Sequence, residues 1–415
     1  MNQELERKGK LAKQASRQLI CASTDTKNRA LENMAQALQD HMQEILAANQ
    51  VDLEAAAEKG IRGALLDRLT LTPERIASMQ EGILQIRDLE DPIGETVSMS
   101  VRPNGLEIGK KRVPIGVIGI IYEARPNVTA DAAALCLKTS NAVILRGGKE
   151  ALHSNLCIVN VLAQAIRGAG MPDGTLQIVE DTSRETAREM MKLNDYIDIL
   201  IPRGGAGLIQ TVVKESTVPV IETGVGNCHT YVDQWADLEK AVAIAVNAKC
   251  SRPGVCNAME TILVHADVAE AFLPRMAAEM EPYYVELRGC ARTCAILPGI
   301  RAAEEEDYAT EFLDLILAVK IVDSLEDAIE HISRYSSGHS EAIVTENYTN
   351  ARRFQQEVDA AAVYANASTR FTDGFEFGFG AEIGISTQKM HARGPMGLEA
   401  LTSIKYVISG NGQIR

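Results

Sequence analysis

Two of the eight cysteines stand where a nucleophile is chemically useful. Cys256 lies in the stretch Ser-Arg-Pro-Gly-Val-Cys-Asn of residues 251–257, which follows an expected helix and combines a Pro-Gly turn with a cation. A reactive thiol needs such a polar, accessible and partly positive loop. Cys228 is the rival because His229 adjoins it, but adjacent side chains of an extended segment point to opposite faces. The local chemistry therefore favours Cys256 over Cys228.

Three glycine-bearing segments follow expected strands and are candidates for cofactor contacts. Glycines after a parallel strand let the backbone approach a ligand, and the next helix N-terminus favours an anion. Glycine at a strand-to-helix turn is also routine for structural reasons, but three cases in succession favour a nucleotide site. The segments are Arg146-Gly147-Gly148-Lys149, Arg203-Gly204-Gly205-Ala206-Gly207 and Glu222-Thr223-Gly224-Val225-Gly226-Asn227.

The elements that must position these residues alternate between strand and helix. Apolar runs at residues 113–122, 141–148, 175–180, 197–207 and 218–224 predict strands, and helical patterns at 129–140, 153–170 and 185–193 separate the first four of them. Such alternation predicts an α/β fold with a parallel sheet flanked by helices. A second α/β region is expected over residues 230–365.

The first ninety residues predict helices. Apolar residues recur at helical spacing from Leu31 to Ile45 and from Ile76 to Ile86, the second set behind the cap-like run of residues 71–74. Residues 97–108 then alternate around Asn104-Gly105, which predicts a hairpin. A hairpin leaving an α/β body often serves subunit assembly, and a decorative role is equally compatible with the pattern.

Composition excludes several classes of protein. The net charge of −14 disfavours a nucleic-acid partner, which needs a basic face. The charged start has no apolar signal region and the apolar runs are too short to span a bilayer, so we expect a cytoplasmic protein with no membrane partner. Reduced cysteines are then expected. Cys290 and Cys294 have no neighbouring His or Cys cluster in the sequence, so no metal site is expected.

Beyond residue 95 the chain resembles the aldehyde dehydrogenase superfamily. Members carry a glutamate at a glycine-rich strand end and the nucleophilic cysteine about thirty-four residues later, and here Cys256 follows Glu222 by 34 residues. The strand end that grips the adenosine ribose in members matches residues 146–149, and the glutamate that holds the nicotinamide ribose matches Glu311. The resemblance implies a Rossmann-type cofactor domain, an α/β catalytic domain and a small β oligomerisation element.

Within the superfamily the chain is similar to the gamma-glutamyl phosphate reductases. The signature of that family stands from Val322 to Ile343 and includes His331, Tyr335, His339 and Glu341. Residues 122–127, 251–257 and 389–396 are also typical of it. The resemblance implies NADPH-dependent reduction of an acyl phosphate through a thioester on Cys256, with L-glutamyl 5-phosphate as the substrate and the semialdehyde as the product of this step of proline biosynthesis.

The resemblance also implies roles for the other candidate residues. The cofactor would be held by Arg146, Gly147, Gly148, Lys149, Arg203, Gly204, Gly205, Gly224 and Glu311. The oxyanion would be stabilised by the backbone N–H of Cys256, helped by Asn257 or Asn127. Glu222 is either turned away from the thioester or used to adjust the protonation of the cysteine. The substrate α-carboxylate would take one of three arginines, Arg125, Arg252 and Arg393, each of which has a structural ion pair as its alternative.

The expected domain organisation follows the same resemblance. Residues 1–94 and 113–226 would bind NADPH, residues 227–385 would form the catalytic domain, and residues 95–112 and 386–415 would make subunit contacts in a homo-oligomer. The resemblance also implies a functional partner, the glutamate kinase that supplies the acyl phosphate. Two other hypotheses are an acylating dehydrogenase for a CoA thioester or another acyl phosphate, and a catalytically silent nucleotide-binding protein on the same fold.

Overall fold

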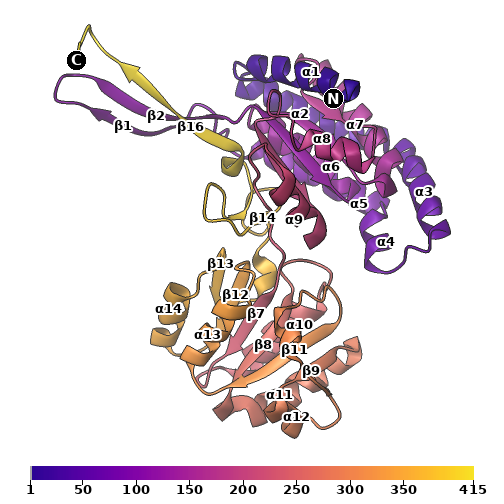
Figure 1. The fold of residues 1–415 in the computed structure, drawn as a ribbon, viewed down its shortest axis with the longest axis vertical. Helices are drawn as coiled ribbons and strands as arrows, with labels where there is room; N and C mark the ends of the chain where they lie inside the picture. Colours follow the sequence, from indigo (N-terminus) through magenta and orange to yellow (C-terminus); the bar gives the residue numbers. More distant parts are fainter. Residues whose placement is uncertain (1) are drawn as a thin grey trace. The chain divides into compact units, whose positions relative to one another are not determined.

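The computed structural model describes residues 2–415, which fold into two compact units (Figure 1). Within these residues, unit 1 contains 2–223, 378–384 and 396–415, and unit 2 contains 224–377 and 385–395. The chain therefore leaves unit 1 twice, after residues 223 and 384, and returns to it twice. The functional labels given to the parts of the chain stay predictions.

Unit 1 begins with a run of helices and then alternates between strand and helix. Its helices are α1 (Gln3–Leu19), α2 (Thr24–Asp40), α3 (Met42–Glu58), α4 (Ala64–Leu69), α5 (Pro73–Asp88), α6 (Pro126–Lys138), η1 (Lys149–Ala151), α7 (Leu152–Gly168), α8 (Arg184–Met190), α9 (Ala206–Glu215) and η5 (Glu399–Leu401). Its strands are β1 (Thr96–Val101), β2 (Glu107–Pro114), β3 (Val117–Tyr122), β4 (Ala142–Arg146), β5 (Leu176–Ile178), β6 (Ile199–Arg203) and β16 (Thr402–Ser409).

The central sheet of unit 1 is parallel, in the order β5-β4-β3-β6, as the alternation predicted. Every residue of β3 is buried, which is expected of a strand covered on both faces. The predicted strand at residues 218–224 is wrong: the segment makes only a single bridge, between Leu200 and Val220. Pro219 has no N–H to donate to a ladder, which limits pairing at this point.

The helical prediction for the start of the chain holds with one correction. Helix α5 begins as expected, with Pro73 in its first turn and the Thr72 side chain accepting from the Arg75 N–H. The apolar pattern from Leu31 to Ile45 belongs to two helices, because α2 ends at Asp40 and α3 starts at Met42. His41 between them has φ −103° and ψ 15°, outside helical geometry.

The predicted hairpin is present as β1 and β2, joined by a turn at residues 102–106. β16 pairs antiparallel with β2 over its whole length and completes a three-stranded sheet. Figure 1 shows this sheet projecting from the helical body of unit 1. All six residues of β1 are exposed, among them Val97, Met99 and Val101. No helix within residues 2–415 has both the length and the apolar character to cross a membrane.

Unit 2 is a second α/β unit, built on a parallel sheet in the order β10-β9-β11-β8-β7-β12-β13. Its strands are β7 (Cys228–Val232), β8 (Met259–His265), β9 (Glu286–Gly289), β10 (Arg301–Ala302), β11 (Ile316–Val322), β12 (Ser340–Val344), β13 (Ala362–Ala365), β14 (Ile385–Ser386) and β15 (Gly394–Pro395). Its helices are α10 (Leu238–Cys250), α11 (Ala266–Met280), η2 (Glu281–Tyr283), α12 (Ala291–Ile296), η3 (Glu305–Ala309), α13 (Leu325–Tyr335), α14 (Tyr348–Glu357) and η4 (Thr369–Phe371).

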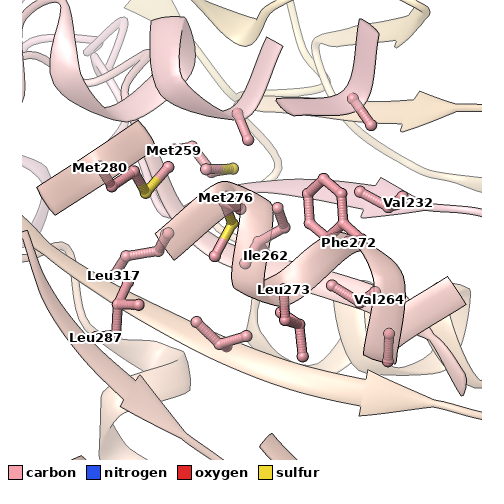
Figure 2. Packing of buried hydrophobic residues seen from close by; sticks show 14 of the residues in the cluster. Val232, Met259, Ile262, Val264, Phe272, Leu273, Met276, Met280, Leu287 and Leu317 are labelled. Carbon is pink, nitrogen blue, oxygen red and sulfur yellow. The ribbon is translucent and has the colours of Figure 1, made fainter. Parts of the chain in front are cut away.

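The core of unit 2 lies between its sheet and α10, α11 and α12. Figure 2 shows Phe272, Leu273 and Met276 of α11 beside Ile262 and Val264 of β8. Phe272 and Met276 are fully buried. Burying a side chain of this size stabilises the fold by roughly 1.5–3 kcal/mol. This packing fixes α10 and β8, and so it fixes both ends of the loop that carries Cys256.

Candidate active site

The candidate residues of unit 2 meet at one edge of its sheet. β11, β8, β7 and β12 are consecutive neighbours and run in the same direction, so the segments that precede them reach the same edge. Those segments are residues 305–315, 251–258, 224–227 and 336–339. They carry Glu311, Cys256, Gly224 and the end of the signature segment, so residues far apart in sequence become neighbours.

Cys256 is half-buried in the loop between α10 and β8, and the segment before β7 packs directly against it. A Cβ on Gly226 would lie 2.5 Å from the Cα of Cys256, and nearer still to its carbonyl group. Only glycine permits this approach. The Gly226 N–H in turn donates to Glu311 Oε1 at 2.8 Å. The structure therefore links Cys256 and Glu311, two residues expected in the site, through one glycine.

Cys228 is not placed as a nucleophile. Its side chain is fully buried, and burial raises the pKa of its thiol well above the ordinary range, helped by the charge of Glu341. Cys228 Sγ donates to the carbonyl oxygen of Cys256 at 3.1 Å. Cys228 therefore stabilises the backbone at Cys256 through this hydrogen bond.

Asn257 has its side chain committed to the fold. Its amide N–H groups donate to the carbonyl oxygens of Arg370, at 3.2 Å, and Thr372, at 2.9 Å, and its Oδ1 accepts from the Arg370 guanidinium. The amide has two N–H donors, and both are used. The predicted help of Asn257 in oxyanion stabilisation is therefore not supported by this geometry. Sequence reasoning missed Arg370, which the chain brings from 113 residues away.

A buried ion pair lies under the segment that carries Glu311. Lys249 Nζ and Glu260 Oε2 are 2.5 Å apart, and both side chains are fully buried. Burial raises the pKa of Glu260 to about 7 and lowers the pKa of Lys249. Glu260 Oε1 also accepts from the Leu313 N–H at 3.1 Å, where Leu313 has a left-handed φ of 55°. The pair thus fixes an unusual turn two residues after Glu311.

The signature segment makes hydrogen bonds to the residues just before and at the start of β7. Asn227 donates from its side chain to the carbonyl oxygens of Tyr308 and Tyr335, both at 2.8 Å, and its N–H donates to Ser337 Oγ at 2.9 Å. Glu341 accepts from the His229 N–H at 2.8 Å. The signature residues therefore contact the segment that packs on Cys256.

In unit 1, the glycine-bearing strand ends are adjacent at the carboxyl edge of the parallel sheet. β3 lies between β4 and β6, with Ile121 opposite Arg146 and Tyr122 opposite Arg203. α9 starts directly after Gly204 and Gly205, and the Gly205 N–H donates to Glu123 Oε2 at 2.9 Å. The edge thus presents a helix N-terminus that already attracts a carboxylate.

Two expected cofactor residues differ in their surroundings. The Arg146 guanidinium donates to the carbonyl oxygens of Thr182 and Ser183, so it holds the loop after β5 and does not extend toward solvent. Burial lowers its pKa. Lys149, at the start of η1, is exposed. For Arg146 to contact the cofactor with its guanidinium, those carbonyl contacts would have to break, whereas Lys149 needs no such change.

The other expected residues are divided between the units. Unit 1 holds Glu222, Arg125 at the N-terminus of α6, and Asn127, whose amide donates to Asp131 at 3.3 Å. Unit 2 holds Gly224, Arg252 and Arg393. Arg393 donates to Asp359 at 2.7 Å, and Lys389 shares the same carboxylate. The structure thus shows Arg393 in the surface ion pair that was its alternative role.

Comparison with known proteins agrees with this arrangement. Residues 2–306 match the model of the aldehyde dehydrogenase family. The chain belongs to that family. It is 64% identical over 412 residues to a gamma-glutamyl phosphate reductase from Heliobacterium modesticaldum, covering 99% of both chains. It is 61% identical to one from Caldanaerobacter subterraneus, covering 99% of this chain and 100% of that one. The crystal structure of a gamma-glutamyl phosphate reductase from Thermotoga maritima matches with a TM-score of 0.95 and 50% identity, covering 99% and 100% of the chains.

Membership of the aldehyde dehydrogenase family makes the chain an oxidoreductase that uses a nicotinamide nucleotide. The carboxyl edge of the unit 1 sheet fits such a group. Asn155 Nδ2 is buried there and has no hydrogen-bond partner among the described residues. A Cβ on Gly147 would lie 2.3 Å from this nitrogen, so glycine makes room for the amide at the strand end. The unsatisfied donor fits a polar atom of a bound nucleotide.

Proposed function

We propose that this enzyme reduces L-glutamyl 5-phosphate to L-glutamate 5-semialdehyde and phosphate, with NADPH as the reductant and Cys256 as the nucleophile. The observation that carries the proposal is the placement of a half-buried Cys256 against Gly226, linked to Glu311, in a chain 64% identical to a gamma-glutamyl phosphate reductase. That match covers 99% of this chain. The reaction is the second step of proline biosynthesis.

The residues of the chain perform the chemistry in two stages. The Cys256 thiolate attacks the γ-carbonyl, an S–C bond forms, and phosphate leaves with the electrons of its C–O bond. A bound nicotinamide nucleotide supplies the hydride that converts the thioester carbonyl into a thiohemiacetal. That adduct collapses, the S–C bond breaks, and the semialdehyde is released with the thiolate restored. A thioester accepts hydride far better than a carboxylate, which is the value of the covalent route.

The oxyanion that forms at the carbonyl is stabilised mainly by the backbone N–H of Cys256. Asn257 acts differently from the expectation: it positions the loop, because its amide is bonded to residues 370 and 372. Glu311 holds the Gly226 N–H and contributes to cofactor binding. Glu222 adjusts protonation at the cysteine or is turned away from the thioester, and both roles stay open.

Preference for NADPH is assigned to Lys149. Relatives that prefer NAD have an acidic residue three positions after the strand-end cation, and this chain has a lysine there, exposed at the start of η1. An ammonium attracts the 2′-phosphate that a carboxylate would repel. We also infer a homo-oligomer built on the exposed β1-β2-β16 sheet. The glutamate kinase that makes the acyl phosphate is proposed as a functional partner.

The decisive experiment follows NADP+ reduction with glutamate 5-semialdehyde and phosphate. The wild type should be active, Cys256→Ala should lose activity while still binding NADPH, and Cys228→Ala should keep a measurable fraction. Loss of one neutral hydrogen bond costs about 1 kcal/mol, or roughly fivefold. An active Cys256→Ala enzyme beside a dead Cys228→Ala enzyme would reverse the assignment. NADP+ reduction with free coenzyme A in place of phosphate, and none with phosphate, would support the acylating dehydrogenase instead.

A further inference from the structure

Arg370 spans the loop that carries the nucleophile. Its Nε donates to Ser251 Oγ at 3.1 Å, and its Nη1 donates to Asn257 Oδ1. Ser251 stands at the start of the loop and Asn257 directly after Cys256. The Thr369 hydroxyl also donates to the carbonyl oxygen of Asn257, at 2.8 Å. The guanidinium is therefore bonded to the loop on both sides of Cys256.

A second arginine lies beside the first and adds to the positive charge. Arg252 directly follows Ser251, which Arg370 contacts. Burial lowers the pKa of Arg370, and the nearby charge of Arg252 lowers it further, whereas Asp373 and the two thiols act in the opposite direction. Neither arginine forms an ion pair within the part of the chain that the structure describes. A guanidinium stays charged at any ordinary pH, so the loop carries an excess of positive charge.

We propose that Arg370 and Arg252 form an anion subsite that binds the phosphate group of the acyl phosphate. The proposal rests on the proposed function and adds the residues that recognise the reacting end of the substrate. Phosphate is joined to the carbonyl carbon that the sulfur attacks, so it lies within a few bonds of Cys256. Planar guanidinium groups match phosphate oxygens with paired N–H donors.

This placement gives the arginines a role in the first chemical stage. As the S–C bond forms, the C–O bond to phosphate breaks and its electron pair stays with phosphate. Positive charge beside the departing group stabilises the anion that develops. The same contacts hold inorganic phosphate for attack on the thioester when the reaction runs backward. The substrate α-carboxylate lies several bonds further from the sulfur, and the experiment distinguishes it as the alternative anion.

The test uses the reverse reaction of the full-length enzyme, because phosphate and semialdehyde are then separate substrates. Arg370→Lys and Arg252→Ala should each raise the KM for inorganic phosphate by about tenfold or more, and the KM for the semialdehyde should stay within about threefold. Arg353→Ala is the matched control: this arginine of unit 2 is paired with Glu326 and Glu357, and its removal should leave both constants unchanged. Arg252 is exposed and makes no hydrogen bond or ion pair within the part of the chain that the structure describes, so Arg252→Ala should fold even if changes at Arg370 do not.

A second readout does not depend on turnover. Inorganic phosphate should protect Cys256 of the wild type from iodoacetamide, followed by mass spectrometry of the loop peptide, and Arg370→Lys should lose that protection. A rise in the KM for semialdehyde alone would overturn the proposal and assign the arginines to the α-carboxylate. Unchanged constants together with full protection would overturn it outright. A wild type with no phosphate-dependent NADP+ reduction would instead reject the proposed function, and the alkylation assay would still report on anion binding.

Discussion

Replacing Gly226 with alanine tests whether the approach of residues 224–227 to the nucleophile sets the rate. The added Cβ would lie 2.5 Å from the Cα of Cys256, whereas ordinary van der Waals contact begins at 3.4 Å. The Cα of Cys256 would therefore have to retreat by about 0.9 Å, and its carbonyl group by more. Misplacing a reacting group by about 1 Å can cost roughly a hundredfold in rate, or about 2.7 kcal/mol. We expect kcat to fall by at least that factor.

The assay is NADP+ reduction with semialdehyde and phosphate, with NADPH binding and the melting temperature measured on the same samples. Gly168→Ala is the control, because it lies in α7 with ordinary φ and no atom within 4 Å of its added Cβ. That change should leave kcat unaltered and should not lower the melting temperature. A folded Gly226→Ala enzyme with kcat within about threefold of the wild type would refute the steric argument.

Three further predictions concern the cofactor, pH and assembly. Lys149→Glu should lower the preference for NADPH over NADH by about tenfold or more, from about 1–2 kcal/mol of lost attraction, and an unchanged ratio would exclude Lys149 as the phosphate contact. Burial lowers the pKa of His331 to about 2, and Lys320 donates to its Nδ1 at 3.1 Å. Below about pH 6.5 the unfolded chain binds a proton on this imidazole that the folded chain does not bind. Between pH 7.5 and pH 5 the free energy of unfolding of the wild type should therefore fall by about 2 kcal/mol more than that of His331→Gln, as measured by denaturant titration. An equal fall in both proteins would contradict this prediction. Sedimentation should show an oligomer, and a lysine at exposed Val101 should shift it toward monomer, whereas a monomeric wild type would remove the assembly prediction.

The alternation of elements in unit 1 could be predicted from the sequence because the strands of its parallel sheet are short apolar runs closed by turn residues. The N-terminus of α5 followed from Thr72 and Pro73, and the hairpin followed from Asn104-Gly105. The break at His41 could not be predicted, because the apolar spacing continues from α2 into α3 without a proline or glycine. Periodicity identifies a helical face and does not locate a change of axis within it.

The site could be predicted only where function rests on one residue and its immediate neighbours. Cys256 stood out by its loop, and the structure adds that Cys256 is half-buried whereas Cys228 is fully buried. Arg370 had no local signal, because its role depends on η4 lying over a loop more than a hundred residues earlier in the chain. Arg393 had a signal as strong as that of Arg252, and only the position of Asp359 separates them. The order of strands in the sheet decides which loops lie at the same edge, and that order cannot be deduced from the residues of any one loop.

Strand order also explains why the signature segment lies so far along the chain from the nucleophile that it serves. β12 follows α13, the helix of the signature segment, and pairs with β7. β7 in turn pairs with β8, which begins just after Cys256. Ser337 and Glu341 therefore bond to the N–H groups of Asn227 and His229, and Cys228 between them bonds to Cys256. Each buried bond in this series costs about 1–3 kcal/mol to leave unmade, so the signature residues position the nucleophile through the segment before β7. The signature residues can play this role without contact with the reacting atoms.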